Sequence, residues 1–278
     1  MNISDVKRIS DQYGLRPNRK LGQNFLIDEG IRSKIIQAVE PGKEDSILEI
    51  GPGLGSLTFS LAESAGRLTA VEIDSGLHRY LSEQFRDADA VIVHGDFLKL
   101  SFDDVFTKVV SNLPYYCSSE ILFRIVHDLP SVAEIYVMLQ QEMAERIIAA
   151  PGSGGYGALT VSLNLYCVSS KLFRVPAGCF YPRPEVSSVF LRLERKKTLP
   201  LDARGVELFH LIVKSAFWGR RKTLLTSLAR SPHLSFGKDV VAGALSSLGI
   251  SCSARGEDLS LGEYVSLAEK MSALKLTE

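Results

Sequence analysis

Short apolar runs that alternate with helix-patterned segments constrain the fold of this chain more than any other feature. The runs are continuous rather than alternating, which is typical of strands buried on both faces. The segments between them carry helical spacing. Strand–helix repetition of this kind predicts an α/β fold with a Rossmann-like, doubly wound parallel sheet. The predicted strands are Ser46–Ile50, Leu68–Ile73, Ala90–Val93, Lys108–Ser111 and Glu134–Leu139, and the predicted helices between them are 54–63, 76–85 and 118–126.

The pattern changes after residue 150. A loop rich in Gly and Ser at 151–157 precedes two further strand candidates, Leu159–Val168 and Val186–Leu193. The basic, proline-containing stretch at 195–200 is typical of a linker, and only helical patterns follow it. We therefore expect a sheet domain over residues 1–195 and a small all-helical domain over residues 196–278.

Composition excludes several classes of protein. Of 278 residues, 45% are hydrophobic and 23% are charged, which is typical of a globular protein and excludes a disordered chain or a collagen. No apolar run approaches the roughly 20 residues of a membrane helix, and the N-terminal residues form no secretory signal, so we expect a cytoplasmic protein without membrane contact. The four cysteines have no ligand-like spacing, so we expect free thiols and no metal.

The net charge of zero conceals an uneven distribution. Residues 171–230 contain 13 Lys and Arg but 4 Asp and Glu, so this segment carries +9 and the remainder −9. A basic segment of this size can attract a polyanion although the whole molecule is neutral.

A glycine-rich turn follows the first predicted strand, at Gly51-Pro52-Gly53-Leu54-Gly55. Such a turn lets a ligand approach the backbone closely and places it near a helix N-terminus. The dinucleotide fingerprint requires a third glycine where this chain has Ser56, which weakens an NAD interpretation. Gly51 and Gly53 are therefore candidates for binding a nucleoside-containing cofactor.

Acidic residues follow the next two strands. Glu72 lies 21 residues after Gly51, where a carboxylate accepts hydrogen bonds from a ribose diol. Asp96 follows the third strand, where it would accept from an adenine amine while Phe97 packs on the ring. An adenosine of either NAD or S-adenosylmethionine suits these residues, since all of them are expected at the ligand-binding edge of the sheet.

The fourth strand ends in Asn112-Leu113-Pro114-Tyr115-Tyr116, a pattern that suits methylation of an exocyclic base amine. The adenine N6 lone pair is delocalised and is a poor nucleophile. The Asn112 side-chain oxygen and the Leu113 carbonyl would accept from the amine hydrogens, and Pro114 would fix the direction of that carbonyl. Tyr115 or Tyr116 would stack on the extruded base. No strong general base is needed, because the charged product loses its proton readily.

These motifs carry a resemblance that runs almost end to end. The sequence resembles the ribosomal RNA adenine N6-dimethyltransferases, and the combination of LGQNFL, NLPYY and PRPEV is highly specific. The matching segments are 19–26, 48–58, 71–74, 95–98, 112–116, 141–146, 155–157, 180–186 and 217–228.

The resemblance implies roles for particular residues. Asn24 and Leu26 would contact S-adenosylmethionine, and Gly51 would line its methionine end. Asn112 would contact both the methyl donor and the target amine. Phe180 would be the second aromatic residue, sandwiching the flipped adenine against one of the two NLPYY tyrosines.

The resemblance also implies a substrate. It points to dimethylation of N6 of two adjacent adenosines in a hairpin near the 3′ end of 16S rRNA in the small ribosomal subunit, and we expect the enzyme to act as a monomer. Basic side chains would contact RNA phosphates without reading base identity. These are Arg183, Arg220, Arg221 and Lys222, together with Arg16, Arg19, Lys20, Arg195, Lys196 and Lys197.

Three alternatives remain open at this stage. The first is a 23S rRNA adenine dimethyltransferase that confers macrolide resistance, although the NLPYY motif and the developed C-terminal domain favour the 16S type. The second is a nicotinamide dehydrogenase, against which Ser56 and NLPYY argue. The third is a non-catalytic RNA-binding assembly or transcription factor on the same scaffold, against which the intact acids and Asn112 argue.

Overall fold

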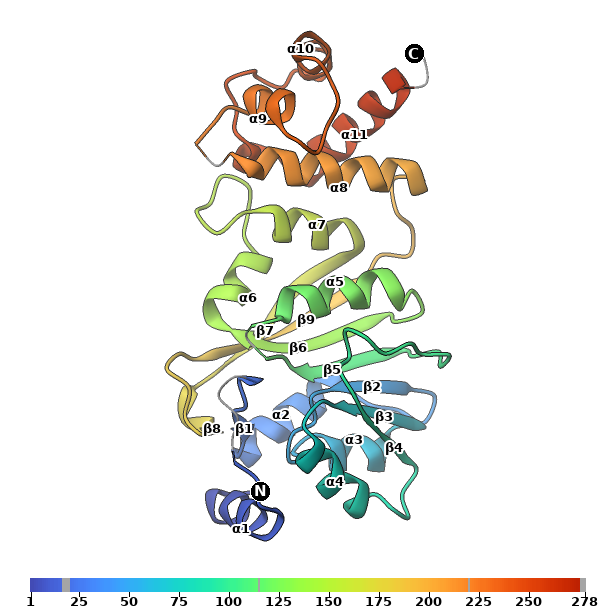
Figure 1. Cartoon of the computed structure of the whole chain (residues 1–278), viewed down its shortest axis with the longest axis vertical. Helices are drawn as coiled ribbons and strands as arrows, with labels where there is room; N and C mark the ends of the chain where they lie inside the picture. Colours follow the sequence, from blue (N-terminus) through green and yellow to red (C-terminus); the bar gives the residue numbers. More distant parts are fainter. Residues whose placement is uncertain (17–20, 115, 220, 276–278) are drawn as a thin grey trace. The chain divides into compact units, whose positions relative to one another are not determined.

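The computed structural model describes residues 1–16, 21–114, 116–219 and 221–275. The chain divides into two compact units (Figure 1). The sheet unit comprises Met1–Ala144 and Ser169–Arg195, and the helical unit comprises Glu145–Val168 and Lys196–Glu278.

The sheet unit is built on a seven-stranded, mostly parallel sheet with the strand order β4-β3-β2-β5-β6-β9-β7. The first five strands in this order, from β4 to β6, run parallel to one another, and β9 runs antiparallel to β6. This confirms the predicted α/β class and all five predicted parallel strands. The bounds are β2 Ser46–Ile50, β3 Arg67–Glu72, β4 Ala90–His94, β5 Lys108–Asn112, β6 Glu134–Gln140, β7 Cys167–Val175 and β9 Ser188–Arg195.

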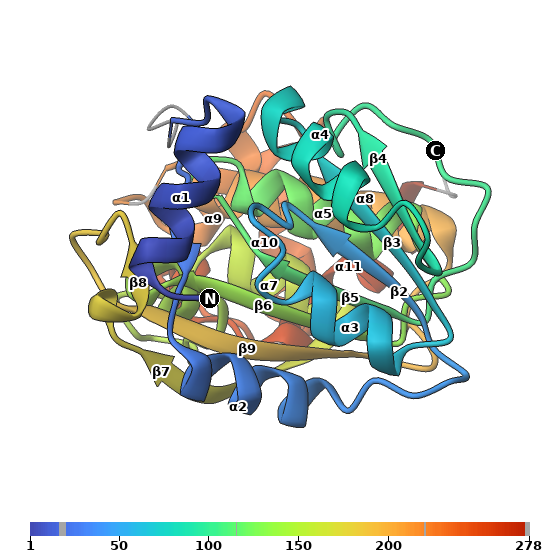
Figure 2. The same ribbon diagram turned by 90° about the horizontal axis from the view of Figure 1, so that it is seen from below.

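Helices pack on the sheet through continuous apolar clusters. Helices α2 and α3 contribute Ile35, Val39 and Leu61 to a cluster with the strand residues Ile47 and Val110. Figure 2 shows these two helices on the opposite side of the sheet from α5. A second cluster joins α1 to α4. The bounds are α1 Ile3–Tyr13, α2 Glu29–Val39, α3 Thr58–Ser64, α4 Ser75–Gln84, α5 Ser118–Asp128 and α6 Gln141–Ile147, the last of which crosses the boundary between the units.

A two-stranded ribbon holds the segment that precedes the sheet. Strand β1 (Phe25–Leu26) pairs antiparallel with β8 (Phe180–Tyr181), which follows the 3-10 turn Ala177–Cys179. The pairing places Leu26 opposite Phe180. Both side chains are buried in the cluster that α2 and α3 share, so residues far apart in sequence fix the position of the N-terminal segment.

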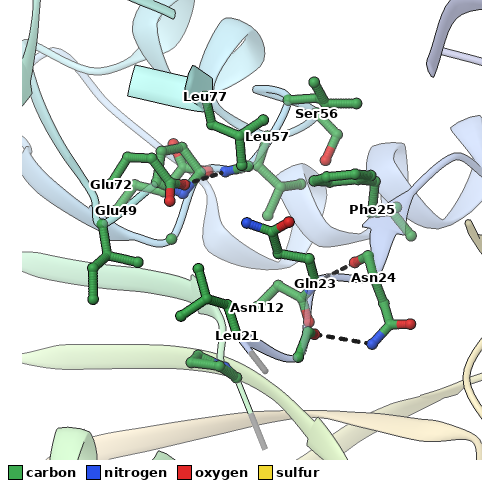
Figure 3. Close-up of a pocket in the computed structure, with 18 of the residues that line it drawn as sticks. Leu21, Gln23, Asn24, Phe25, Glu49, Ser56, Leu57, Glu72, Leu77 and Asn112 are labelled. Carbon is green, nitrogen blue, oxygen red and sulfur yellow. Dashed lines mark hydrogen bonds between the residues drawn. The ribbon is translucent and has the colours of Figure 1, made fainter. Parts of the chain in front are cut away.

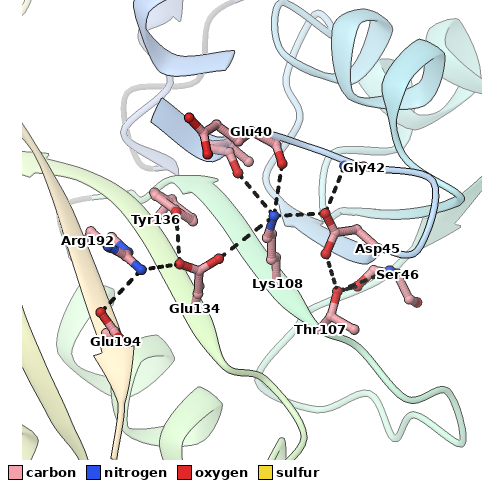
Figure 4. A network of polar contacts seen from close by, with 11 residues as sticks. Glu40, Gly42, Asp45, Ser46, Thr107, Lys108, Glu134, Tyr136, Arg192 and Glu194 are labelled. Carbon is pink, nitrogen blue, oxygen red and sulfur yellow. Dashed lines mark hydrogen bonds and ion pairs between the residues drawn. The ribbon is translucent and has the colours of Figure 1, made fainter. Parts of the chain in front are cut away.

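A polar network closes the edge of the sheet at the amino ends of β2, β5 and β6 (Figure 4). The Lys108 ammonium donates to Asp45 at 2.8 Å and to the carbonyl of Glu40 at 3.0 Å. Glu134 lies 3.8 Å from the same ammonium and also accepts from Arg192. Charged side chains that are nearly buried need partners of this kind. The network lies at the amino ends of the strands, whereas the predicted ligand-binding residues lie at the carboxyl ends.

The helical unit contains five α-helices among its described residues. Helix α8 contacts α7, α9 and α11. The Phe217 ring stacks on Tyr264, whose hydroxyl donates to the carbonyl of Gly256 at 2.8 Å. The bounds are α7 Ala158–Tyr166, α8 Ala203–Trp218, α9 Leu224–Arg230, α10 Lys238–Ser247 and α11 Leu261–Lys275, and the 3-10 turn Gly256–Asp258 precedes α11.

One predicted strand is wrong. The run Leu159–Val168 forms helix α7 over most of its length, and the strand beside it begins only at Cys167. Seven of the nine α7 residues are buried, so the helix is buried around most of its circumference. A short run of this kind cannot be distinguished from a buried strand by periodicity. The Gly157 N–H donates to the Thr160 hydroxyl at 3.2 Å and begins the helix.

The division into units also differs from the expected one. The change at Arg195 coincides with the predicted linker, but residues 145–168 pack with the helices rather than with the sheet. The helical unit is therefore discontinuous in sequence. The physical reason is that α7 buries its apolar surface against α8 and α11.

The remaining structural expectations concern cysteines, metals and membranes. Cys117, Cys167, Cys179 and Cys252 are free, and Cys252 is the exposed one. Within the described parts of the chain, no group of three or more His, Cys, Asp or Glu side chains is arranged to hold a metal ion. None of the described helices combines the length and the apolar character needed to cross a bilayer.

Candidate active site

A pocket opens in the sheet unit at the carboxyl ends of β2, β3 and β5 (Figure 3). The hollow takes in about 710 Å³ of atom-free space, a figure that includes open solvent at its mouth. Because parallel strands end at the same edge, residues from distant motifs meet here. Its lining residues are Leu21–Leu26, Glu49, Gly51–Leu54, Ser56, Leu57, Glu72, Ile73, Leu77, Asn112, Pro114 and Tyr116.

The glycine turn forms one wall of the pocket. Gly51 and Gly53 have φ angles of 69° and 61°, a region that side chains disfavour. A Cβ at Gly53 would also lie 3.2 Å from the Phe25 ring. Helix α3 begins only at Thr58, later than the predicted start at residue 54, because the turn continues through Gly55 at φ 81°.

Glu72 lies at the end of β3 and is held by the turn. Its carboxylate accepts from the backbone N–H of Gly53 at 3.0 Å and of Asp74 at 2.9 Å. Burial raises the pKa of Glu72 to about 7, although these two hydrogen bonds act in the opposite direction. The carboxylate is thus fixed in orientation beside the backbone on which a ligand would lie.

Glu49 is a pocket residue that the sequence analysis missed. It lies on β2 and is 3% exposed, and its Oε2 atom has no hydrogen-bond partner among the described residues. Burial, with a smaller contribution from the nearby charge of Glu72, raises the pKa of Glu49 to about 8. An apolar strand rarely contains a buried carboxylate, so the acid within Ser46–Ile50 was the signal that could have found it.

Asn112 is anchored to the N-terminal segment. Its side-chain Nδ2 donates to the backbone carbonyl of Asn24 at 3.1 Å, and the Asn24 side chain donates to the carbonyl of Gly22 at 3.0 Å. A carbonyl oxygen can only accept, so this contact fixes which end of the Asn112 amide faces it. The other end of the Asn112 amide, its side-chain oxygen, is the end that can accept a hydrogen bond from a ligand.

The rest of the NLPYY motif forms the rim. Pro114 and Tyr116 line the pocket, and Tyr116 is 57% exposed. Leu113 is buried, and its N–H donates to the carbonyl of Met138 at 3.1 Å, which fixes the backbone at the end of β5. Tyr115 lies outside the described residues.

Three predicted residues do not line the pocket. Asp96 accepts from the N–H of Leu98 at 3.0 Å and pairs with exposed Lys99 at 3.4 Å. Phe97 is buried beneath the Arg124 guanidinium. Asp96 and Phe97 do follow β4 at the expected edge of the sheet, but their side chains are not in the pocket lining. Phe180 is 3% exposed within the apolar cluster, so the structure places it in the core rather than in the pocket wall.

The predicted RNA-contacting residues separate into two groups. Arg183, Arg221 and Lys222 are exposed, as a phosphate contact requires. Arg195, by contrast, donates to four backbone carbonyls in and beyond the last turns of α5, and Lys196 donates to the carbonyl of Asn164. Those two cations therefore have hydrogen-bond partners within the protein, and their contact with RNA stays a prediction. Arg19, Lys20 and Arg220 lie outside the described residues.

The charges of the pocket discriminate between cofactors. S-adenosylmethionine carries positive charge on its sulfonium and amino groups, whereas NAD carries an anionic pyrophosphate at the glycine turn. Glu49 and Glu72 place two buried carboxyl groups beside that turn, where a bound cation would favour their ionised forms and an anion would oppose them, and the Oε2 of Glu49 has no hydrogen-bond partner among the described residues. The residues therefore fit S-adenosylmethionine and disfavour the dehydrogenase alternative.

Fold and pocket together define the class: this is a Rossmann-like methyltransferase that uses S-adenosylmethionine. A family model described as "Ribosomal RNA adenine dimethylase" matches residues 14–272. The chain belongs to this family.

Individual relatives agree with that assignment. Two proteins named "Ribosomal RNA small subunit methyltransferase A" match nearly end to end. The one from Pelotomaculum thermopropionicum is 40% identical over 95% of this chain and 94% of its own length, and the one from Moorella thermoacetica is 39% identical over 94% of each.

Solved structures extend the similarity to the fold. A dimethyladenosine transferase from Plasmodium falciparum has a TM-score of 0.80 and 26% identity, covering 90% of this chain and 98% of its own. The 23S rRNA methyltransferase ErmE has a TM-score of 0.69 and 27% identity, covering 90% of this chain and all of its own.

Proposed function

We propose that this enzyme dimethylates N6 of two adjacent adenosines in a hairpin near the 3′ end of 16S rRNA in the small ribosomal subunit. It would act as a cytoplasmic monomer. The observation that supports the proposal is the side-chain amide of Asn112 in the pocket lining, whose Nδ2 donates to the Asn24 carbonyl, so that its oxygen would be the atom to accept from a base amine. The small-subunit relatives are 35–40% identical, against 27% for the 23S enzyme ErmE, which favours the small subunit over the 23S alternative.

Different residues of the pocket would contact different parts of the cofactor. S-adenosylmethionine supplies an electrophilic methyl group. Glu72 would accept from the ribose hydroxyls, and Glu49 would balance positive charge on the methionine portion, since both carboxylates are buried beside the glycine turn. Asn24 and Leu26 would close the pocket from the N-terminal segment, which β1 and β8 hold in place.

The target base would enter at the rim. The Asn112 oxygen and the Leu113 carbonyl would accept from the two N6 hydrogens, favouring a pyramidal and more nucleophilic nitrogen. Tyr116 is exposed at the pocket entrance and would stack on the extruded adenine. In-line placement of the amine would supply much of the acceleration. Asp96, Phe97, Tyr115 and Phe180 remain proposed contributors to adenine recognition; for Phe180 this requires its side chain to leave the core.

The decisive experiment is transfer of labelled methyl groups from S-adenosylmethionine to small subunits that lack the modification, with large subunits in parallel. We expect N6,N6-dimethyladenosine in digests of the small-subunit RNA only. Label in the large subunit would support the 23S alternative. Cofactor binding without any transfer would support the non-catalytic alternative.

A further inference from the structure

Trp218, the single tryptophan of the chain, lies outside every apolar cluster described above. It is 57% exposed at the end of α8. The buried residues of α8 recur at helical spacing, from Leu208 through Ile212 to Ala216. Trp218 is off this stripe and belongs to the opposite face with Lys214, one turn earlier, which is also exposed. The indole is therefore not part of the packing that holds the helix.

Positive charge flanks the indole in the sequence, and one of the lysines packs against the residue next to it. The Lys222 N–H donates to the Gly219 carbonyl at 2.7 Å. A Cβ at Gly219 would lie 3.2 Å from Lys222 Cγ, so the lysine stem packs on the residue next to Trp218. Arg221 and Lys222 are exposed, and no ion pair joins Lys214, Arg221 or Lys222 to a carboxylate within the described residues.

The dipole of α8 accounts for cations near its C-terminus, but it does not account for an exposed indole. An aromatic face flanked by unpaired cations is the arrangement that binds single-stranded nucleic acid, because bases stack on the ring while the cations contact the phosphates. An acidic peptide would use the cations but would have no planar group for the indole.

We propose that Trp218 is a stacking platform for an unpaired base of the ribosomal RNA, with Lys214, Arg221 and Lys222 contacting the adjacent phosphates. The inference rests on the proposed function for the identity of the RNA. The helical unit would then contact a base of the RNA through Trp218 as well as phosphates through its cations. Because stacking tolerates any base, this contact would strengthen RNA binding without selecting the methylated adenosine.

The single tryptophan makes the proposal directly measurable. Tryptophan emission is recorded from the full chain, with excitation at the red edge so that tyrosines do not contribute, while single-stranded oligoadenylate of about 12 nucleotides is added. Full small-subunit rRNA is titrated in a second series. Binding is followed independently by the anisotropy of a label on the RNA. Inorganic polyphosphate, which has the charge but no bases, is the control ligand.

We expect RNA to quench the Trp218 emission and polyphosphate to leave it nearly unchanged. Trp218→Ala should weaken RNA binding by roughly 5- to 100-fold, and Trp218→Phe should restore most of the affinity. Leu199→Ala, which shortens another exposed apolar side chain of the helical unit, should have no effect. In methyl transfer, Trp218→Ala should raise KM for the RNA and leave kcat unchanged.

Two outcomes would overturn the proposal. One is unchanged tryptophan emission at RNA concentrations that saturate the anisotropy signal. The other is a Trp218→Ala variant that binds assembled small subunits weakly but naked RNA normally, since the indole would then contact a ribosomal protein. Absence of methyl transfer by the unaltered enzyme, with quenching retained, would refute the proposed function while leaving the stacking platform supported.

Discussion

The side-chain amide of Asn112 has a donor, Nδ2, and an acceptor, its oxygen. The donor holds the side chain in place through a hydrogen bond to the backbone. The hydrogen bond from Nδ2 to the Asn24 carbonyl ties the carboxyl end of β5 to the N-terminal segment. A substitution at this position therefore tests whether the acceptor end does chemistry or whether the residue only joins two segments.

Asn112→Ala should leave the fold intact and lower kcat for methyl transfer by roughly 100-fold or more, because one acceptor of the amine hydrogens is lost. The measurement is single-turnover transfer to unmethylated small subunits. Equilibrium binding of S-adenosylmethionine to the same variant is measured in parallel, because Asn112 would also contact the methyl donor, and the fold-loss in kcat should exceed the fold-loss in cofactor affinity. Near-normal turnover would contradict the proposed role of the amide.

Glu49 links the pocket to the pH dependence of stability. Its pKa is about 8 in the folded chain and about 4.5 in the unfolded chain. The folded state therefore binds more protons between these values, so the free energy of unfolding falls as pH rises from about 4.5 to about 8. Glu49→Gln removes this contribution.

We expect the ligand-free variant Glu49→Gln to lose less stability than the unaltered chain between pH 5 and pH 8. The difference should be on the order of 3 kcal/mol, since each pKa unit corresponds to about 1.4 kcal/mol. Urea unfolding at several pH values measures it. The same variant should bind S-adenosylmethionine more weakly. Parallel pH profiles for the two chains would show that burial of Glu49 does not set its pKa.

At the scale of elements, the amino ends of the strands carry the polar network of Lys108 (Figure 4). Burial alone would raise the pKa of Asp45, but hydrogen bonds from Lys108, Gly42 and Thr107 more than offset this, and the pKa lies below its ordinary value. The stability that these contacts contribute is present at neutral pH and is lost as pH falls through the folded-state pKa.

Lys108→Met should destabilise the sheet unit by about 3 kcal/mol at pH 7, because it leaves the carboxylate of Asp45 buried without its cation. The effect should diminish in acid as Asp45 becomes protonated. Arg8→Met, which breaks the exposed pair with Asp5, is the matched control and should cost less than about 0.5 kcal/mol. Equal losses for the two variants in urea unfolding would argue against the network.

The elements also show where sequence patterns were sufficient. All five parallel strands were predicted, because continuous apolar runs bounded by helical spacing have few alternative structures. The run that became α7 was assigned wrongly, because a helix that is buried around most of its circumference shows no amphipathic period. The positions of Glu72, Asn112 and the glycine turn followed from strand ends meeting at one edge. The burial of Phe180 did not, because it depends on the pairing of β8 with β1 across more than 150 residues.

At the scale of the whole molecule, the zero net charge means that attraction to RNA must arise from local charge rather than from the total. The double variant Arg221→Glu with Lys222→Glu should weaken RNA binding. It should also reduce the magnitude of the slope of log K against log salt concentration by roughly 1.5, because two phosphate contacts are lost. The control pair is Lys238→Glu with Lys270→Glu, which changes the net charge equally at exposed sites on α10 and α11. An unchanged salt slope for the first pair, or an equal loss for both, would exclude a local phosphate contact.

The division into units predicts what happens when the chain is cut at Arg195, the boundary that the sequence pattern suggests. The remaining residues 1–195 retain α7 but lose α8 and α11, against which α7 packs. The apolar surface of α7 would then be exposed to water, and such surfaces associate. We expect the truncated chain to aggregate in size-exclusion chromatography, whereas the full chain should not.

Replacing Leu159, Leu163 and Tyr166 by lysine in the truncated chain should reduce the aggregation. A monodisperse, cofactor-binding chain of residues 1–195 would instead show that α7 belongs to the sheet unit.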